Sequence, residues 1–388
     1  MDLLDPELYG DIARMHDVFR GLRARPGLQR DTRNNLWAAV HHDDLIEVER
    51  NDRVFVSGQG FRATPSPMER DMIALDDPEH AEQRRLIARR FTPKSVKALE
   101  PFVVTLVDEL IDAVIDDGEL DVVDDLAAQM PARLTAHLLG FPEEIWADIK
   151  SWSERLMRYD ETNRDETALQ GFVGAIMEFS QVLGPLIEQR RAEPADDLVS
   201  VWAKSSLADC PMADDVIMQE TGLVISGGAE TTRTVIGRGL AELCSHSDQW
   251  EAIAVAPESI PVAVEELIRW VTPLNNFFRT ATDDVRVGDV GVANGDRVIL
   301  LYPSANRDEK HFDRPDELDL TRQPNPHVAF GFGTHFCLGA SLARMELRVL
   351  LERMAARLTR LELLEGPDIE ANIFVGAVRS CRIGFAAR

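Results

Sequence analysis

One cysteine surrounded by glycines, a histidine and aromatic residues is the strongest chemical signal in this sequence. Residues 330–339 read Phe-Gly-Phe-Gly-Thr-His-Phe-Cys-Leu-Gly, with the thiol at Cys337. Gly331 and Gly333 lack Cβ atoms, so the backbone can adopt positive φ angles and approach a flat ring closely. Apolar residues at helical spacing follow from Ala340 to Leu358, which places Cys337 at a helix N-terminus. The helix end is expected to lower the thiol pKa and stabilise a thiolate, a haem-iron ligand that favours O–O cleavage.

A second chemical group lies inside a long predicted helix, Asp214 to Ser245, where Gly227 and Gly228 precede Ala-Glu-Thr. Each glycine in a helix interior costs about 1 kcal/mol relative to alanine, so the pair requires a reason. Thr231 lies four residues after Gly227. Its hydroxyl can compete for a hydrogen bond to the Gly227 carbonyl, loosen the helix and open a local groove. The alternative is a glycine pair that lets helices pack closely, with Glu230 in solvent.

The predicted helices, strands and loops also place several basic side chains. Asp77 and Pro78 are interpreted as the N-cap and first residue of a helix, which puts His80 and Arg84 one turn apart on one face. Arg279 is predicted in a strand, and His335 lies within the cysteine loop.

Two other groups carry weaker signals. His41-His42-Asp43-Asp44 resembles a set of metal ligands by composition, but a helix cap by Asp43 or Asp44 is the favoured interpretation. Glu266 and Arg269 share one helix face, as surface ion pairs commonly do, and the pair alone indicates no function.

Composition excludes several classes of protein. The chain has 388 residues, 45% of them hydrophobic, and a net charge of −25, which excludes nucleic acid and anionic lipid as main partners. Its four cysteines show no paired spacing, so neither a disulfide framework nor a zinc site is indicated, and a reducing cytoplasm is expected. The first 30 residues contain no apolar run long enough for a membrane anchor.

The remaining sequence predicts one continuous, mainly α domain over residues 1–388. Helical periodicity is present in Val96–Ile115, Leu126–Leu139, Glu143–Tyr159, Thr167–Arg191, Asp214–Ser245 and Pro261–Val271. Strand-like alternation is short, in Phe277–Thr282, Asp296–Leu301 and Ile373–Val378. An irregular stretch, Arg314–Pro326, leads into the cysteine loop.

The cysteine loop resembles the haem-binding segment of the cytochrome P450 superfamily, Phe-Gly-x-Gly-x-His-x-Cys-x-Gly followed by a small residue. All six specified positions match, at Phe330, Gly331, Gly333, His335, Cys337 and Gly339, and Ala340 is the small residue. The resemblance runs from about Trp37 to Val378. It implies a large helical part with small β-sheets at its edge.

The resemblance also implies residue roles. Cys337 would bind the iron of haem b, and His80, Arg84, Arg279 and His335 would hold its propionates, with the glycines and Phe330 beside the ring. Glu230 and Thr231 inherit the acid and alcohol that supply protons during O2 activation. Glu266, Arg269 and Arg322 would form a structural cluster on the cysteine side.

The activity implied is that of a soluble bacterial monooxygenase that hydroxylates an unactivated C–H bond, using O2 and electrons from a ferredoxin and ferredoxin reductase. A peroxygenase and a non-catalytic haem-binding sensor are the rival functions. Segments 197–201, 227–233 and 327–338 are similar to actinobacterial enzymes that oxidise sterol side chains, so a sterol or steroid is the favoured substrate. A macrolide, terpenoid or fatty acid is the alternative.

Two surfaces are predicted by position. The substrate pocket is expected to be lined by the segments Phe61–Ile73, Arg158–Glu166, Thr272–Phe278 and Asn372–Gly376, with Val224 and Gly227. Several of these residues are apolar, which suits a hydrophobic ligand: Phe61, Met68, Met72, Ile73, Phe277, Phe278 and Phe374.

Segment 84–97 carries six basic and no acidic residues. It is interpreted as a docking face for an acidic ferredoxin, extended by Arg344 and Arg348. The alternative is solvated helix charges.

Overall fold

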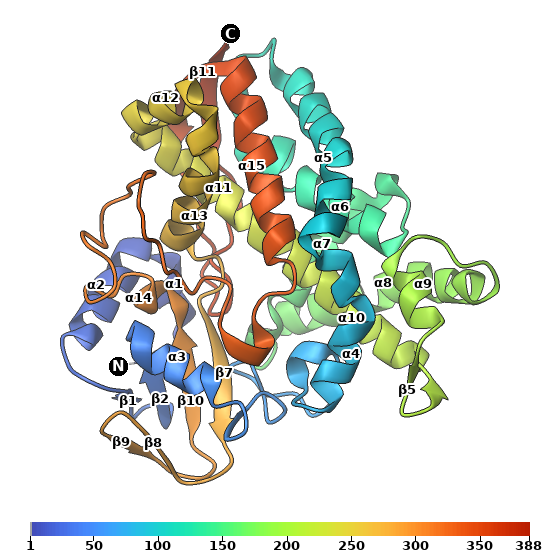
Figure 1. Cartoon of the computed structure of the whole chain (residues 1–388), viewed down its shortest axis with the longest axis vertical. Helices are drawn as coiled ribbons and strands as arrows, with labels where there is room; N and C mark the ends of the chain where they lie inside the picture. Colours follow the sequence, from blue (N-terminus) through green and yellow to red (C-terminus); the bar gives the residue numbers. More distant parts are fainter. Residues whose placement is uncertain (1) are drawn as a thin grey trace.

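The computed structural model describes residues 2–388, so Met1, which the predicted domain includes, lies outside the described residues. Helices form most of the chain (Figure 1). Their bounds are α1 Pro6–Gly10, α2 Ile12–Arg23, α3 His42–Arg50, α4 Glu79–Ile87, α5 Pro93–Val114, α6 Gln129–Leu139, α7 Trp146–Leu156, α8 Glu166–Ala192, α9 Leu198–Ala203, α10 Asp214–Ile225, α11 Thr231–Ser245, α12 Ser247–Val255, α13 Ile260–Val271, α14 Tyr302–Ala305 and α15 Ala340–Arg357.

Small sheets lie at the edge of the helical part (Figure 1). The largest has the order β1-β2-β10-β7-β3, formed by Gln29–Asp31, Leu36–Ala39, Arg297–Leu301, Asn276–Ala281 and Phe55–Val56. A second sheet joins β11 (Leu358–Glu365), β12 (Arg382–Ala387) and β4 (Glu119–Asp121), and two hairpins join β5 (Ser206–Leu207) to β6 (Cys210–Pro211) and β8 (Val285–Val287) to β9 (Val290–Val292). The predicted fold, mainly α with edge sheets, is confirmed.

Two of the three predicted strands are confirmed as β7 and β10, which pair antiparallel with Arg279 opposite Val298. The third, Ile373–Val378, is wrong, because this segment makes only isolated bridges through Val375 and Val378. Asparagine side chains replace a ladder here: Asn276 Nδ2 donates to the Ile373 carbonyl at 2.8 Å. The segment is apolar because it is buried, not because it belongs to a sheet.

The predicted helices are present, but several are divided. The long Asp214–Ser245 segment is interrupted by η6, a π-helical turn over Ser226–Glu230. The predicted Leu126–Leu139 helix begins later, at Gln129, because its first two residues belong to another π-helical turn, η3 (Val122–Ala127). The Glu143–Tyr159 segment begins and ends in short 3₁₀ turns around α7.

Two predicted helix caps are wrong. Helix α4 begins after Pro78, and Asp77 instead bonds the Nδ1 of His80 at 3.0 Å and the amide of Ala81. Helix α3 has His41 at its N-cap, so Asp43 and Asp44 lie in its first turn. The amide of His42 donates to a carboxylate from elsewhere in the chain, Asp308, at 3.0 Å.

The main core lies where α5, α11, α13 and α15 pack together. Figure 1 shows α15 and α5 side by side in front of α11. The cysteine loop enters α15 directly, so the loop is fixed to the largest apolar cluster of the protein. Within residues 2–388, each helix is too short or too polar to cross a bilayer.

Candidate active site

A cavity of about 250 Å³ lies between the cysteine loop and the η6 turn. Its wall includes Cys337 and Leu338 on one side and Gly227, Gly228 and Thr231 on the other. The two strongest sequence signals, more than a hundred residues apart in the chain, therefore face one space. Of the other loop residues predicted at the site, Phe330, Gly331 and Gly339 line the cavity and Gly333 does not.

The loop before Cys337 has the backbone conformation that its glycines predict. Gly331 and Gly333 have φ angles of +69° and +70°. The sequence predicts that these glycines approach a flat ring, but the nearest atoms to both belong to Glu49, in α3. A Cβ on Gly333 would lie 2.6 Å from the Glu49 carbonyl oxygen. The amide of Cys337 donates to the Phe330 carbonyl at 2.9 Å and closes the loop. Gly333 thus allows close packing of the loop on α3.

The expectation that the helix end lowers the Cys337 pKa is wrong for the thiol alone. Burial raises the pKa of Cys337 above its usual value, while the amides of Gly339 and Ala340 and the charges of Arg84 and Arg344 act in the opposite direction. A bound metal ion deprotonates a coordinating thiol outright. The amides and cations would therefore stabilise a Cys337 thiolate if a metal ion were bound there.

The four basic residues predicted to bind the cofactor, His80, Arg84, Arg279 and His335, all line the cavity. The His80 and His335 rings lie 4.3 Å apart between centroids. Burial and the nearby charges of Arg279, His80 and Arg84 lower the pKa of His335 to about 2. The mutual repulsion of these groups indicates a site prepared for an anion.

This part of the wall fits the carboxylates of a haem. His80 is 2% exposed, and its Nε2 is buried without a hydrogen-bond partner among residues 2–388. Its Nδ1 is held by Asp77, so the ring orientation is fixed. A buried ring nitrogen without a partner is costly, and a carboxylate would satisfy it.

Sequence reasoning missed Glu49 and Tyr302, which line the same part of the cavity. Tyr302 donates to Glu49 Oε1 at 2.8 Å, and Arg279 lies 3.6 Å from the same oxygen. Burial raises the pKa of Glu49 to about 7, against the opposing effects of Arg279 and Tyr302. No local signal marks Glu49, because its helix is rich in acids that face solvent.

Thr231 makes the hydrogen bond that its spacing predicts. Its Oγ1 donates to the Gly227 carbonyl at 2.7 Å, across the π-helical turn. A Cβ on Gly227 would meet no atom within 4 Å, whereas a Cβ on Gly228 would lie 3.0 Å from Thr135 Oγ1, in α6. Gly227 therefore fits the groove interpretation, and Gly228 fits close helix packing.

Glu230 does not line the cavity. It is 1% exposed, and its Oε1 accepts from Arg233 Nη2 at 2.6 Å. Arg233 also pairs with Glu154, on α7. Burial raises the pKa of Glu230 to about 7, with Arg233 opposing the rise. The second oxygen of Glu230 has no partner among the described residues, so the carboxyl group is held by one cation only.

The predicted cluster of Glu266, Arg269 and Arg322 is confirmed. Glu266 and Arg269 are fully buried and lie 2.7 Å apart, and Arg322 Nε contacts both carboxylate oxygens of Glu266 at 3.1 Å. Arg269 and Arg322 also donate to backbone carbonyls of the segment 306–317. The cluster thus fixes the irregular chain that leads to the cysteine loop.

The substrate-pocket prediction is confirmed in part. Met72, Ile73, Val224, Gly227, Pro273, Leu274 and Phe277 line the cavity. The prediction is wrong for Phe61, Phe278 and Phe374, whose side chains are buried in the core and do not line the cavity. It is also wrong for Met68, which is 76% exposed and does not line the cavity. No residue of 158–166 or 372–376 is part of the cavity wall within the described chain.

Comparison with known proteins identifies the family. The family model of Cytochrome P450 matches residues 260–371. A steroid C26-monooxygenase of Mycolicibacterium smegmatis is 38% identical over 369 residues, covering 95% of this chain and 91% of that protein. A linalool 8-monooxygenase of Pseudomonas putida is 32% identical, with 93% of each chain covered.

Solved structures agree. A Bacillus megaterium protein crystallised in complex with testosterone superimposes with a TM-score of 0.87 at 28% identity, covering 95% of this chain and 97% of that one. Together with the cysteine loop, the opposing Thr231 groove and the cation cluster, these relatives show that the chain belongs to the cytochrome P450 family and is a P450 monooxygenase.

Proposed function

We propose that this monooxygenase hydroxylates an unactivated C–H bond of a sterol or steroid. The observation that carries the proposal is the apolar wall beside Thr231, formed by Met72, Ile73, Leu223, Val224, Leu274 and Phe277. Such a wall binds a rigid hydrocarbon by burial of apolar surface, with few polar contacts. The steroid C26-monooxygenases and the testosterone complex among its relatives support the same substrate class.

The residues have distinct roles in this proposal. Cys337 binds the iron of haem b, and His80, Arg84, Arg279 and His335 hold the propionates. When bound, the haem supplies O2 activation and oxygen insertion. Thr231 presents a hydroxyl to the cavity, and Glu230 provides a proton from behind the helix after its carboxyl group turns away from Arg233.

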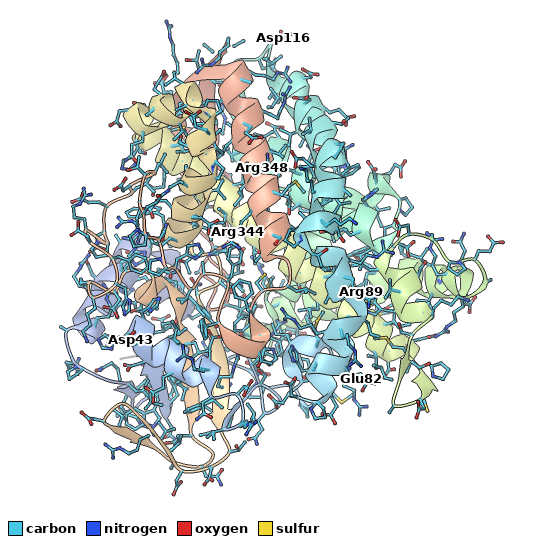
Figure 2. All side chains as sticks on the ribbon, in the orientation of Figure 1. Asp43, Glu82, Arg89, Asp116, Arg344 and Arg348 are labelled. Carbon is cyan, nitrogen blue, oxygen red and sulfur yellow. The ribbon has the colours of Figure 1, made fainter. Side chains whose placement is uncertain are left out.

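Electrons are proposed to come from a ferredoxin and its reductase. Arg85, Arg89, Lys94 and Lys97 are exposed and form no ion pair within residues 2–388, on a chain of net charge −25. Arg344 and Arg348, predicted to extend this face, lie on α15 (Figure 2). Arg344 pairs with Glu265, and Arg348 pairs with Glu100 and Glu352. The docking face is therefore proposed at the α4–α5 turn.

A terpenoid is the second candidate substrate, because the linalool 8-monooxygenase is 32% identical. The test is a substrate-induced spin-state titration with steroids and acyclic terpenoids, followed by product analysis with NAD(P)H, ferredoxin and reductase. Steroid binding with a hydroxylated product supports the proposal, and terpenoid binding alone replaces it. Product with H2O2 but not with the electron-transfer system would indicate a peroxygenase, and binding without product would indicate a sensor.

We also infer a cytoplasmic location, which the free state of all four cysteines supports.

A further inference from the structure

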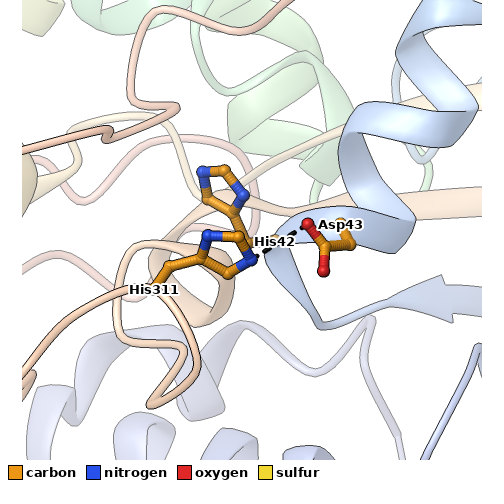
Figure 3. Close-up of side chains that lie close together, drawn as sticks. All are labelled: His42, Asp43 and His311. Carbon is orange, nitrogen blue, oxygen red and sulfur yellow. Dashed lines mark ion pairs between the residues drawn. The ribbon is translucent and has the colours of Figure 1, made fainter.

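We propose that His42, Asp43 and His311 form a second metal site, which binds a zinc ion at the protein surface. The three side chains converge from the start of α3 and from the segment after α14 (Figure 3). One potential ligand atom from each lies within 4.8 Å of the others. His311, which is 269 residues from His42 in the chain, was not part of the metal-like cluster in the sequence.

His42 is prepared as a ligand. It is 5% exposed, and its Nε2 donates to the Pro326 carbonyl at 2.8 Å. With the proton on Nε2, the Nδ1 lone pair is free, and this buried nitrogen has no partner among residues 2–388. A histidine that ligates a metal generally donates its other ring N–H to a carbonyl or carboxylate, which fixes the tautomer and the ring.

The neighbouring His41 provides an internal contrast. It is equally buried, but its Nδ1 contacts Asp44 at 3.2 Å and its Nε2 contacts the Arg23 carbonyl at 3.0 Å. Both nitrogens of His41 are therefore occupied, whereas one nitrogen of His42 is not. This difference separates a structural histidine from a candidate ligand.

Asp43 and His311 supply the movable part of the site. Asp43 Oδ1 lies 2.9 Å from His311 Nε2, and the His311 and His42 rings stack with centroids 4.1 Å apart. The Asp43 and His311 side chains are 73% and 26% exposed, so both can shift. Ligands of a tetrahedral zinc ion lie roughly 3.3 Å apart, given zinc–nitrogen distances of about 2.0–2.1 Å. Separations of up to 4.8 Å must therefore shorten, and the stacked His311 ring must turn so that its nitrogen faces the same point as His42 Nδ1.

The surroundings favour an ion of this class. The site opens onto a surface groove also lined by Ile46, Glu47, Arg50 and Asn51. Two imidazoles and one carboxylate suit zinc far better than magnesium, and a water molecule completes the tetrahedron.

Calorimetric titration of ZnCl2 into the haem-loaded, untagged enzyme tests the site. One zinc ion per chain is expected to bind to the wild type. His311→Ala, at a partly exposed side chain, and Asp43→Asn, at an exposed one, should each weaken zinc binding by at least roughly tenfold. His246→Ala, at a partly exposed histidine on another face, is the matched control and should bind as the wild type does.

The outcomes are decisive because the ligand variants need not disturb the core. If zinc fails to bind the wild type stoichiometrically, or binds His311→Ala unchanged, the site does not exist as proposed. MgCl2 is the second arm: competition by magnesium at equal concentration would assign the binding to carboxylates alone and would also overturn the proposal. The ferrous-CO spectrum of each variant verifies that the haem site is intact.

Discussion

The Thr231 hydroxyl donates to the Gly227 carbonyl at 2.7 Å, inside the widened helical turn that borders the cavity. The bond occupies one lone pair of that carbonyl and holds the hydroxyl at the cavity wall. With its one proton given to the Gly227 carbonyl, the hydroxyl has only acceptor lone pairs left for the cavity, and it can donate there only after it rotates away from that carbonyl.

Thr231→Ala is expected to retain haem and substrate binding but to lose coupling, because no hydroxyl remains to order the proton supply. Product formed per NAD(P)H consumed should fall by at least roughly tenfold, in keeping with the usual contribution of a proton-transferring group. Thr231→Ser should recover much of the loss. Thr221→Ala is the control, since Thr221 makes the same bond to the Ile217 carbonyl at 2.8 Å but does not line the cavity. Equal coupling in Thr231→Ala and Thr221→Ala would exclude the role.

Cys337→His is expected to abolish the red-shifted Soret band of the ferrous-CO complex, because a histidine ligand does not donate electron density as a thiolate does. Cys210→Ser, at an exposed cysteine, should retain the band. The measurement is the difference spectrum of the reduced, CO-bound protein. A band that persists in Cys337→His would mean that another residue binds the iron.

Arg322→Ala is expected to destabilise the protein strongly, because it leaves the fully buried Glu266 with one partner fewer. Removal of one member of a buried ion pair costs about 3–5 kcal/mol. Arg314→Ala, in an exposed pair with Glu317, should change the urea midpoint little. Similar midpoints for the two variants would contradict a structural role for the Glu266 cluster.

Stability should fall with rising pH in part because of Glu346. Burial raises the pKa of this carboxyl group from 4.5 to about 8. The folded state therefore keeps a proton that the unfolded state releases above about pH 4.5, so its contribution is complete below that pH and is lost between about pH 4.5 and 8. The slope is at most about 1.4 kcal/mol per pH unit.

Glu346→Gln should remove this part of the pH dependence, since the amide resembles the protonated acid and does not titrate. The measurement is the unfolding free energy of both proteins at about pH 5 and about pH 8. The control is Glu352→Gln, a partly exposed acid paired with Arg348. If Glu346→Gln and the wild type lose equal stability between the two pH values, the carboxyl group is not the source.

Arg89→Glu and Lys94→Glu are each expected to slow reduction by a ferredoxin at low salt, because steering by opposite charge accelerates association. Higher ionic strength should slow reduction of the wild type as well. Arg33→Glu is the control, at an exposed arginine between β1 and β2. Stopped-flow rates equal to the wild type in both α4–α5 variants would exclude this docking face.

The features that sequence predicted are those carried by local spacing. The glycines around Cys337, the four-residue step from Gly227 to Thr231 and the three-residue step from Glu266 to Arg269 each fix a backbone or side-chain relation within one or two turns. Their positive φ angles and hydrogen bonds follow from steric rules that need no tertiary information.

The features that sequence could not predict depend on contacts between distant segments. Glu49 resembles any acid on a surface helix until Tyr302 and Arg279 surround it. Glu230 keeps the position expected of it, but Arg233 and Glu154 determine where its carboxyl group points. The Cys337 pKa is higher than its place at a helix end predicts for the same reason, because burial outweighs the helix end.

The widened turn at Ser226–Glu230 also aligns the cavity wall. Residues four apart in a regular α-helix drift by about 40° around the axis, so Leu223 and Val235, twelve residues apart, would diverge by about 120°. One extra residue accommodated in a π-bulge cancels about 100° of that rotation, which leaves about 20°. Leu223, Gly227, Thr231 and Val235 all line the cavity, as this geometry requires. Deleting a single residue from the turn would swing Thr231 away while leaving the helix composition almost unchanged.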